Sequence, residues 1–318
     1  MLQPRRQHPQ PPPPVPVVRH DNMAEKNLGG QQRGGVEEGG AVGAPGKKNA
    51  ATTPPYRPVL EFIVQAGSML HVEPQTSAAA LVYYHRYNAF IVTLPANQGR
   101  MDDYMAAMAC VHLSAKQCEE PLKMRDVINV CYWLVAVKEN AEEAKGNDEN
   151  VKGKSHYRGR DPYLVIGDEY WDLKTSLMTA ELALLRILRF DVGKVRSPFP
   201  YVVGLLADMR KDLSAIHADG DGRKQMTLDD LTAVAQTALG FAHDAHLCPR
   251  IADDWLAMPV ELALAATYLA LRVHCIAPRK PFVEWCMYEG LEREEVAKVE
   301  DLVQDIMAFI REWREKTP

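Results

Sequence analysis

The chain has 318 residues, a formal net charge of −5 and 47% hydrophobic residues, which is enough for one or two globular domains with a sizeable core. The mild acidic balance, without a dense Lys/Arg stripe, argues against a nucleic-acid-binding protein, because phosphates require clustered positive charge. No stretch approaches the roughly 18 apolar residues of a membrane helix, and the N-terminus lacks the apolar segment of a signal peptide. We therefore expect a protein of the nucleus or the cytoplasm that binds neither nucleic acid nor membrane.

Residues 1–55 are rich in Pro, Gly, Gln and Ala and nearly free of large apolar groups. Such a segment cannot bury enough surface to offset its ordering entropy, so we predict a disordered tail. Its stretch from Arg6 to Pro12 fits the +xxPxxP pattern of ligands for proline-binding domains, although a plain solvated tail is the favoured interpretation.

From residue 56 onward, successive segments show the hydrophobic periodicity of helices, and no run alternates with the period of a strand. The fold class is therefore predicted to be all-α. The helices are expected over residues 59–70, 74–90, 101–116, 124–137, 170–190, 199–213, 228–246, 259–275 and 294–313. Residues 138–161 between the fourth and fifth helices are charged and Gly-bearing, which predicts a solvated insertion.

The two halves of this helical region share a pattern. Ala107-x-Ala109-x-x-x-Leu113-x-x-Lys116 lines up with Ala263-x-Ala265-x-x-x-Leu269-x-x-Arg272, and each run lies in the middle of its half. Alanine-built helices that are apolar nearly all round are approached closely by their neighbours. We therefore predict a duplicated domain of about five helices, over 56–196 and 197–318, each wrapped around a small-residue central helix.

One charged residue, Glu181, lies on the apolar face of its predicted helix. Its neighbours at helical spacing are apolar: Leu177, Met178, Leu184 and Leu185. The Glu181 carboxylate is therefore expected to be buried at a cost unless it has a partner. Lys116 ends the central helix of the same half and is the candidate partner. A fixed Lys–Glu pair at the mouth of a bundle offers a donor and an acceptor to another protein's backbone, which indicates recognition. The alternative interpretation is a structural ion pair, or a residue that lies at the edge of the apolar face and reaches water.

Other chemical motifs are weak. His243-x-x-His246-x-Cys248 has ligand-type residues but no third ligand at sound spacing, which favours histidines with structural hydrogen bonds over a zinc site. No motif for nucleotide binding or nucleophilic catalysis is present, and we expect no catalytic residue, no cofactor and no metal. The triplet Lys138-Glu139-Asn140 resembles a degradation signal read by a ubiquitin ligase, a partner that this short pattern supports only weakly.

Four stretches carry a family resemblance: "FIVQAG" (62–67), "RDVINV" (125–130), "YWDLKTS" (170–176) and "AELALLRILRF" (180–190). In this order and spacing they resemble the cyclins, from about Tyr56 to Trp313. The resemblance implies tandem five-helix cyclin boxes, which agrees with the duplication. It also implies a non-catalytic activator that holds the C-helix of a cyclin-dependent protein kinase in the active position, the kinase being of the cyclin-dependent kinase 10 type.

The resemblance implies kinase-binding roles for Lys116, Glu181 and Glu119, with apolar support from Leu177 and Leu184. In the family, a lysine ends the central helix and a glutamate lies nine residues before a phenylalanine, as Glu181 does here. The usual K-x-E-E sequence departs at Cys118, so that only Glu119 remains of its glutamates. The first helix also lacks the Arg and Trp pattern with which mitotic cyclins dock substrates.

Three rival interpretations remain at this point. A cyclin-fold transcription factor or adaptor would bind nucleic acid or other proteins without activating a kinase. A helical metalloenzyme would use His243 and His246. An inert helical scaffold would co-purify with no kinase activity.

Overall fold

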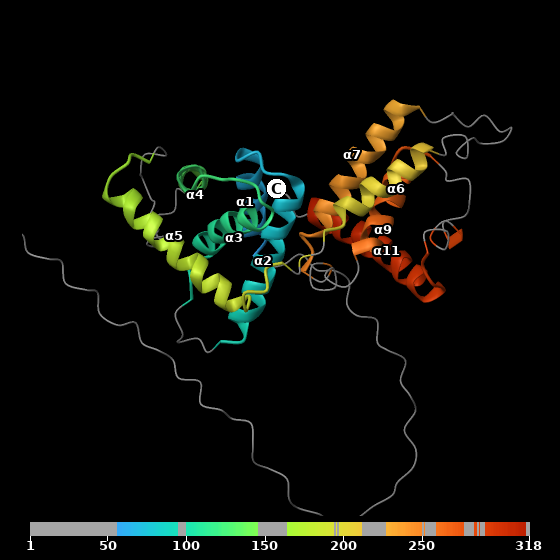
Figure 1. The fold of residues 1–318 in the computed structure, drawn as a ribbon. Coiled ribbons are helices and arrows are strands. Elements are labelled where there is room, and N and C mark those ends of the chain that lie inside the picture. The colour runs from blue at the N-terminus through green and yellow to red at the C-terminus, as the bar shows by residue number, and fades with distance from the viewer. Residues whose placement is uncertain are drawn as a thin grey trace, which may run out of the picture. The chain divides into compact units, whose positions relative to one another are not determined.

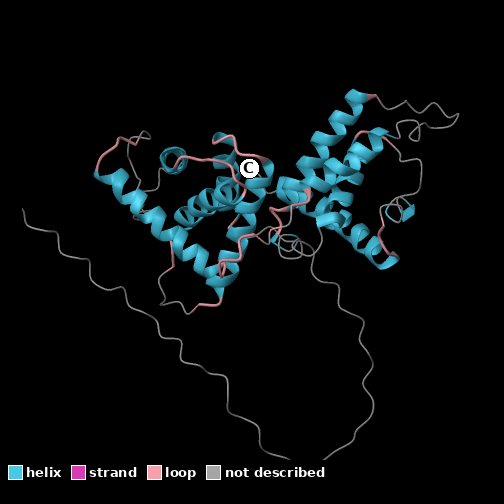
Figure 2. Cartoon of the chain, in the orientation of Figure 1, coloured by secondary structure: helices cyan, strands magenta, loops and turns pink. Residues whose placement is uncertain are grey.

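A computed structural model describes residues 56–94, 100–145, 164–193, 195, 197–211, 227–249, 251, 259–276, 283–284, 286 and 290–315. The predicted tail over 1–55 and residues 146–161 of the predicted insertion lie outside these ranges. Within them, the regular structure is helical, with loops and turns but no strand (Figure 2). The predicted all-α class is confirmed.

The main helices of the described residues follow the predicted order closely. They are α1 (Arg57–Met69), α2 (Pro74–Val92), α3 (Asp103–Gln117), α4 (Met124–Lys145), α5 (Asp168–Ile187), α6 (Phe199–Lys211), α7 (Leu228–Ala245), α9 (Pro259–Val273) and α11 (Arg293–Glu315) (Figure 1).

The two alanine-built helices are the buried centres of their neighbourhoods. α3 is buried from Ala106 to Ala115 and packs against α1, α2, α4 and α5. α9 is buried from Leu262 to Leu271 except at Tyr268, and packs against α6, α7 and α11. Small side chains let neighbouring backbones approach on every side, which is why a helix without a polar face is stable here. The division at 196/197 into two boxes remains a prediction, since residues Lys48–Pro318 cluster as one unit.

Buried histidines connect α2 with the end of α7. His85 Nε2 donates to the His246 carbonyl oxygen at 2.9 Å, and His85 Nδ1 accepts from the Tyr56 hydroxyl at 3.0 Å. Burial lowers the pKa of His85 to about 4 and the pKa of His246 to about 3. Both rings are therefore neutral at ordinary pH, and their hydrogen bonds hold the first-half helix α2 against the second-half helix α7.

α4 is longer than its sequence pattern predicts. The helix continues to Lys145, so the first eight residues of the predicted insertion are helical. Lys138 lies on this helix, where its Nζ donates to the Pro58 carbonyl oxygen at 3.3 Å and lies 5.6 Å from the centre of the Phe62 ring. The side chains of Glu139 and Asn140 lie outside the described residues. No helix in the described ranges has the length and apolar character needed to cross a membrane.

Candidate protein-binding site

The C-terminus of α3 places Lys116 at the surface. The backbone N–H of Glu120 donates to the Ala115 carbonyl at 2.8 Å, and Glu119 adopts a left-handed φ of +58°. This is the Schellman arrangement that closes a helix, with Glu119 at the position where glycine is usual. The turn ends the buried part of α3 at Ala115 and directs the next residue, Lys116, toward solvent.

α5 supplies the acidic partner. Glu181 is 8% exposed and lies between Leu177 and Leu184, both of which are fully buried. Lys116 Nζ donates to both carboxylate oxygens of Glu181, at 2.9 Å to Oε1 and 2.8 Å to Oε2. The structure thus brings together the two residues that the sequence pairs.

A third residue completes the cluster. His112 lies one turn before Lys116 on α3, and its Nδ1 donates to Glu181 Oε1 at 2.6 Å. Its side chain is 4% exposed, whereas the Lys116 side chain is 52% exposed. Glu181 is therefore fixed from the core by His112 and from the solvent side by Lys116.

The cluster keeps the carboxylate ionised. Burial alone would raise the pKa of Glu181, but the hydrogen bonds from His112 and Lys116, together with the electrostatic interaction of the carboxylate with both side chains, bring that pKa below its ordinary value. A buried carboxylate with two charge-assisted donors is held in a single geometry. The resulting surface feature is a rigid ion pair with a half-exposed ammonium group.

Exposed apolar side chains flank this pair on α5. Trp171, Met178 and Leu182 are 52%, 55% and 44% exposed, and their spacing of seven and four residues places them on one face of the helix. Leu177 and Leu184, by contrast, pack beneath Glu181 in the core. Neither the exposed face of α5 nor the role of His112 was predicted from the sequence.

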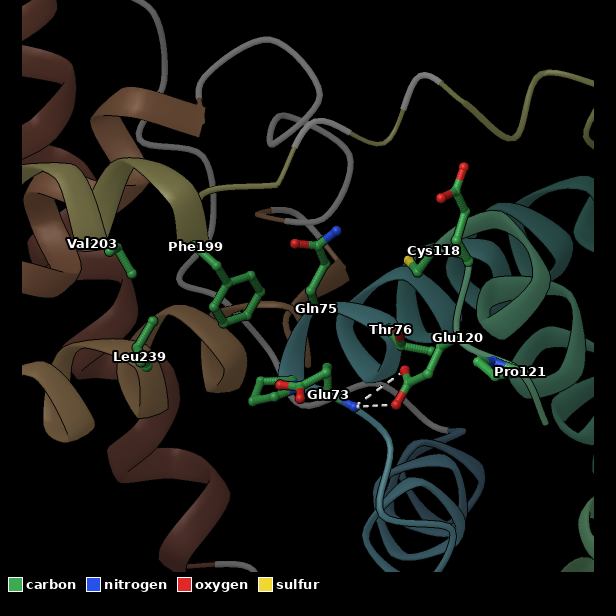
Figure 3. Close-up of a pocket in the computed structure, with 11 residues that line it drawn as sticks. Glu73, Gln75, Thr76, Cys118, Glu120, Pro121, Phe199, Val203 and Leu239 are labelled. Atoms are coloured by element: carbon green, nitrogen blue, oxygen red, sulfur yellow. Dashed lines mark hydrogen bonds between the residues drawn. The ribbon is translucent and has the colours of Figure 1, made fainter.

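A pocket of about 570 Å³ lies beyond the α3 turn (Figure 3). Cys118, Glu119 and Glu120 line one side of it, and Phe199 of α6 and Leu239 of α7 line the other. Glu119, predicted to contact a partner, is exposed at this position.

The histidines considered as zinc ligands make structural hydrogen bonds. His243 Nε2 is hydrogen-bonded to Ser77 Oγ at 3.0 Å, and His246 Nδ1 donates to the Ala242 carbonyl at 2.6 Å. In the part of the chain that the structure describes, no three His, Cys, Asp or Glu side chains are grouped closely enough to hold a metal ion.

Comparison with known proteins identifies sequence relatives of this chain. No protein-family model matches it. Mouse cyclin-L2 is 27% identical over 242 residues, which cover 75% of this chain and 38% of the relative. Zebrafish cyclin-L1 is 26% identical over 243 residues (75% and 39%), and human cyclin-K is 22% identical over 262 residues (81% and 36%). The chain therefore spans a little more than a third of the length of the relatives that it matches.

A solved structure shares the fold. A chain of the yeast RNA polymerase II CTD kinase complex CTDK-1 matches with a TM-score of 0.50 and 17% identity, covering 80% of this chain and 64% of that chain. At this identity the match establishes the fold alone, and it extends over both halves of the helical region.

Proposed function

We propose that this chain, a relative of the cyclins in sequence and in fold, is the non-catalytic regulatory subunit of a cyclin-dependent protein kinase. The observation that carries the proposal is the ion pair of Lys116 and Glu181, which is fixed by His112 and flanked by exposed Met178 and Leu182. We name these four exposed or pairing residues, Lys116, Glu181, Met178 and Leu182, the α3–α5 surface.

The chemistry of phosphoryl transfer explains what such a surface does. A kinase is active only when the ion pair of its own C-helix and its metal-binding Asp are both in place. A partner that binds the inward position of that helix more tightly than the outward one shifts the kinase toward the active state by the difference in binding free energy. The α3–α5 surface offers a rigid donor and acceptor for helix-terminal backbone groups and an apolar strip for the helix face.

The buried residues of the site have a supporting role in this proposal. Leu177 and Leu184 fix the position of α5 from below, and Glu119 extends the surface at the end of α3. The surface belongs to the first proposed cyclin box, over 56–196. The second proposed box, over 197–318, contacts the first box where α7 packs against α2.

We further propose the finer assignment to the cyclin Q type, which pairs with cyclin-dependent kinase 10. "RDVINV" and "AELALLRILRF" support it. The names of the sequence relatives, cyclins L and K, and the polymerase-kinase complex that shares the fold favour a transcription-related role in the nucleus. A ubiquitin ligase that reads residues 138–140 remains a prediction.

The test uses purified full-length chain and cyclin-dependent kinase 10. Lys116→Ala and Glu181→Ala are each expected to weaken binding by roughly 2–4 kcal/mol, as hot-spot residues do, which is about 30- to 1,000-fold in Kd. Loss of kinase activation in a peptide-phosphorylation assay should follow the loss of binding.

Lys298→Ala and Glu300→Ala on α11 are charge-matched controls at exposed positions, and both should bind and activate normally. If Lys116→Ala and Glu181→Ala leave both binding and activation at the level of these controls, the proposed function is wrong. Binding of duplex DNA that weakens with added salt would instead favour the nucleic-acid-binding alternative.

A further inference from the structure

The pocket beyond the α3 turn has an apolar side. Phe199, Val203 and Leu239 line it, and Val203 is 58% exposed. Pro200 and Ala207 are also exposed and lie on the same face of α6 as Val203, at three and four residues from it. The apolar wall of the pocket therefore continues as a strip along the outside of α6, in the second half of the chain.

The facing side of the pocket is acidic. Glu73 and Glu119 line it, and neither carboxylate forms an ion pair with another residue in the described part of the chain. Two carboxylates on the same side of the pocket give that side a negative potential.

The positive end of α2, which lies at the pocket, is already neutralised. The backbone N–H of Glu73, at the start of α2, donates to Glu120 Oε1 at 3.0 Å and Oε2 at 3.2 Å (Figure 3). A helix N-terminus attracts anions, but here the chain's own carboxylate occupies that position. An anionic ligand is therefore disfavoured, and a cationic group is favoured.

The polar group between the two walls suits a peptide backbone. Gln75 is exposed and lines the pocket, where its side chain extends between the Phe199 side and the Cys118 side (Figure 3). An amide offers both a donor and an acceptor, which is the combination that an extended backbone requires. The volume of about 570 Å³ accommodates a few side chains of such a segment.

We propose that this pocket, with the strip along α6, docks a short extended segment of a partner protein other than the kinase, in which a lysine or arginine lies next to apolar residues. The cationic group pairs with Glu73 and Glu119, the apolar residues cover Val203 and Leu239, and Gln75 binds the backbone. The docking goes beyond the proposed kinase regulation and does not require it. Glu119 is common to the pocket wall and the proposed kinase-binding surface, whereas Val203 and Glu73 line the pocket and lie outside that surface.

The test is selection of a display library of random nine-residue peptides on the full-length chain. We expect enriched peptides to contain a basic residue flanked by apolar residues. Their affinity should fall at least about tenfold on Val203→Asp, because a charge at an apolar contact must be desolvated. Glu73→Lys should abolish binding of the basic peptides, and a selection on that variant should enrich peptides without a basic residue.

Met307→Asp is the matched control for Val203→Asp, since Met307 is an exposed apolar residue on α11, outside the pocket. It should leave the peptide affinity unchanged. Kinase binding of Val203→Asp and Glu73→Lys should equal that of the unmodified chain, which separates this docking from the proposed function. The proposal is overturned if enriched peptides lack a basic residue, or if their binding is equally strong on Val203→Asp and Glu73→Lys.

Discussion

The hydrogen bond of His112 to Glu181 predicts a positioning role for this buried histidine. His112→Ala removes a charge-assisted bond of 2.6 Å to a carboxylate that is only 8% exposed. Hydrogen bonds to charged groups are worth about 1.5–3 kcal/mol, and removing one also leaves part of the carboxylate's desolvation uncompensated. We expect the free energy of unfolding to fall by about 2–4 kcal/mol, since truncation adds a cavity term to the lost bond.

A double-mutant cycle separates the bond from the cavity. Urea unfolding of His112→Ala, Glu181→Ala and the double variant should give a coupling free energy of about 1.5–3 kcal/mol. Kinase affinity should also fall on His112→Ala, although this residue is too deeply buried to touch a partner, because Lys116 alone leaves Glu181 with more than one orientation. A variant that merely lowered stability would not change the affinity of the folded fraction.

Ser114→Ala is the control on the same helix. Ser114 is fully buried and donates to the Val111 carbonyl at 2.9 Å, so its removal costs an ordinary hydrogen bond within α3. It should lower stability by about 1 kcal/mol and leave kinase affinity unchanged. A coupling free energy under about 0.5 kcal/mol, or an unchanged kinase affinity on His112→Ala, would refute the positioning role.

Three further predictions concern stability. His85 and His246 have pKa values of about 4 and about 3 in the folded chain, against 6.5 ordinarily. Because the unfolded chain binds protons first as the pH falls below 6.5, the stability that these neutral histidines contribute is complete above pH 6.5 and is lost toward pH 4. The free energy of unfolding, measured by chemical unfolding between pH 7 and 4, should therefore fall with pH, and a flat profile for the unmodified chain would contradict this. Asp102→Ala should lower the free energy of unfolding by about 1 kcal/mol, since its side chain caps α3 by accepting from two backbone N–H groups, and an unchanged urea midpoint would argue against the cap. Glu119→Gly should raise stability by about 1 kcal/mol, because glycine adopts the left-handed φ of +58° without strain, whereas a loss would show that the Glu119 side chain stabilises the turn.

The central helices were predictable because their apolar, alanine-rich pattern is stable only in a helix that is buried on all sides. A run such as 106–115, apolar nearly all round and rich in alanine, is stable only when neighbours surround it, and the structure buries every one of these residues. The pairing of Lys116 with Glu181 was predictable for a similar reason, since a carboxylate on an apolar stripe must find a partner.

The exposed face of α5 was not predictable from its sequence. Apolar residues occupy nearly the whole circumference of this helix, so periodicity cannot tell the buried Leu177 and Leu184 from the exposed Met178 and Leu182. Packing against α3 decides which face is covered, and that is a tertiary contact. The position of His112 beside Lys116 could have been predicted from the sequence, because a spacing of four residues places both on one face of α3.

The turn after α3 links the two surfaces inferred for this chain. Its Schellman bonds fix where Lys116 leaves the core, and three residues further its Glu119 carboxylate lines the pocket. The next residue, Glu120, caps the start of α2 across 47 positions of sequence, which holds the acidic wall of the pocket against the same turn. Because one turn carries residues of both surfaces, we expect a change in its backbone to affect both. A change that breaks the cap, such as Glu120→Ala, should therefore weaken kinase binding and peptide docking together, whereas Val203→Asp should weaken docking alone.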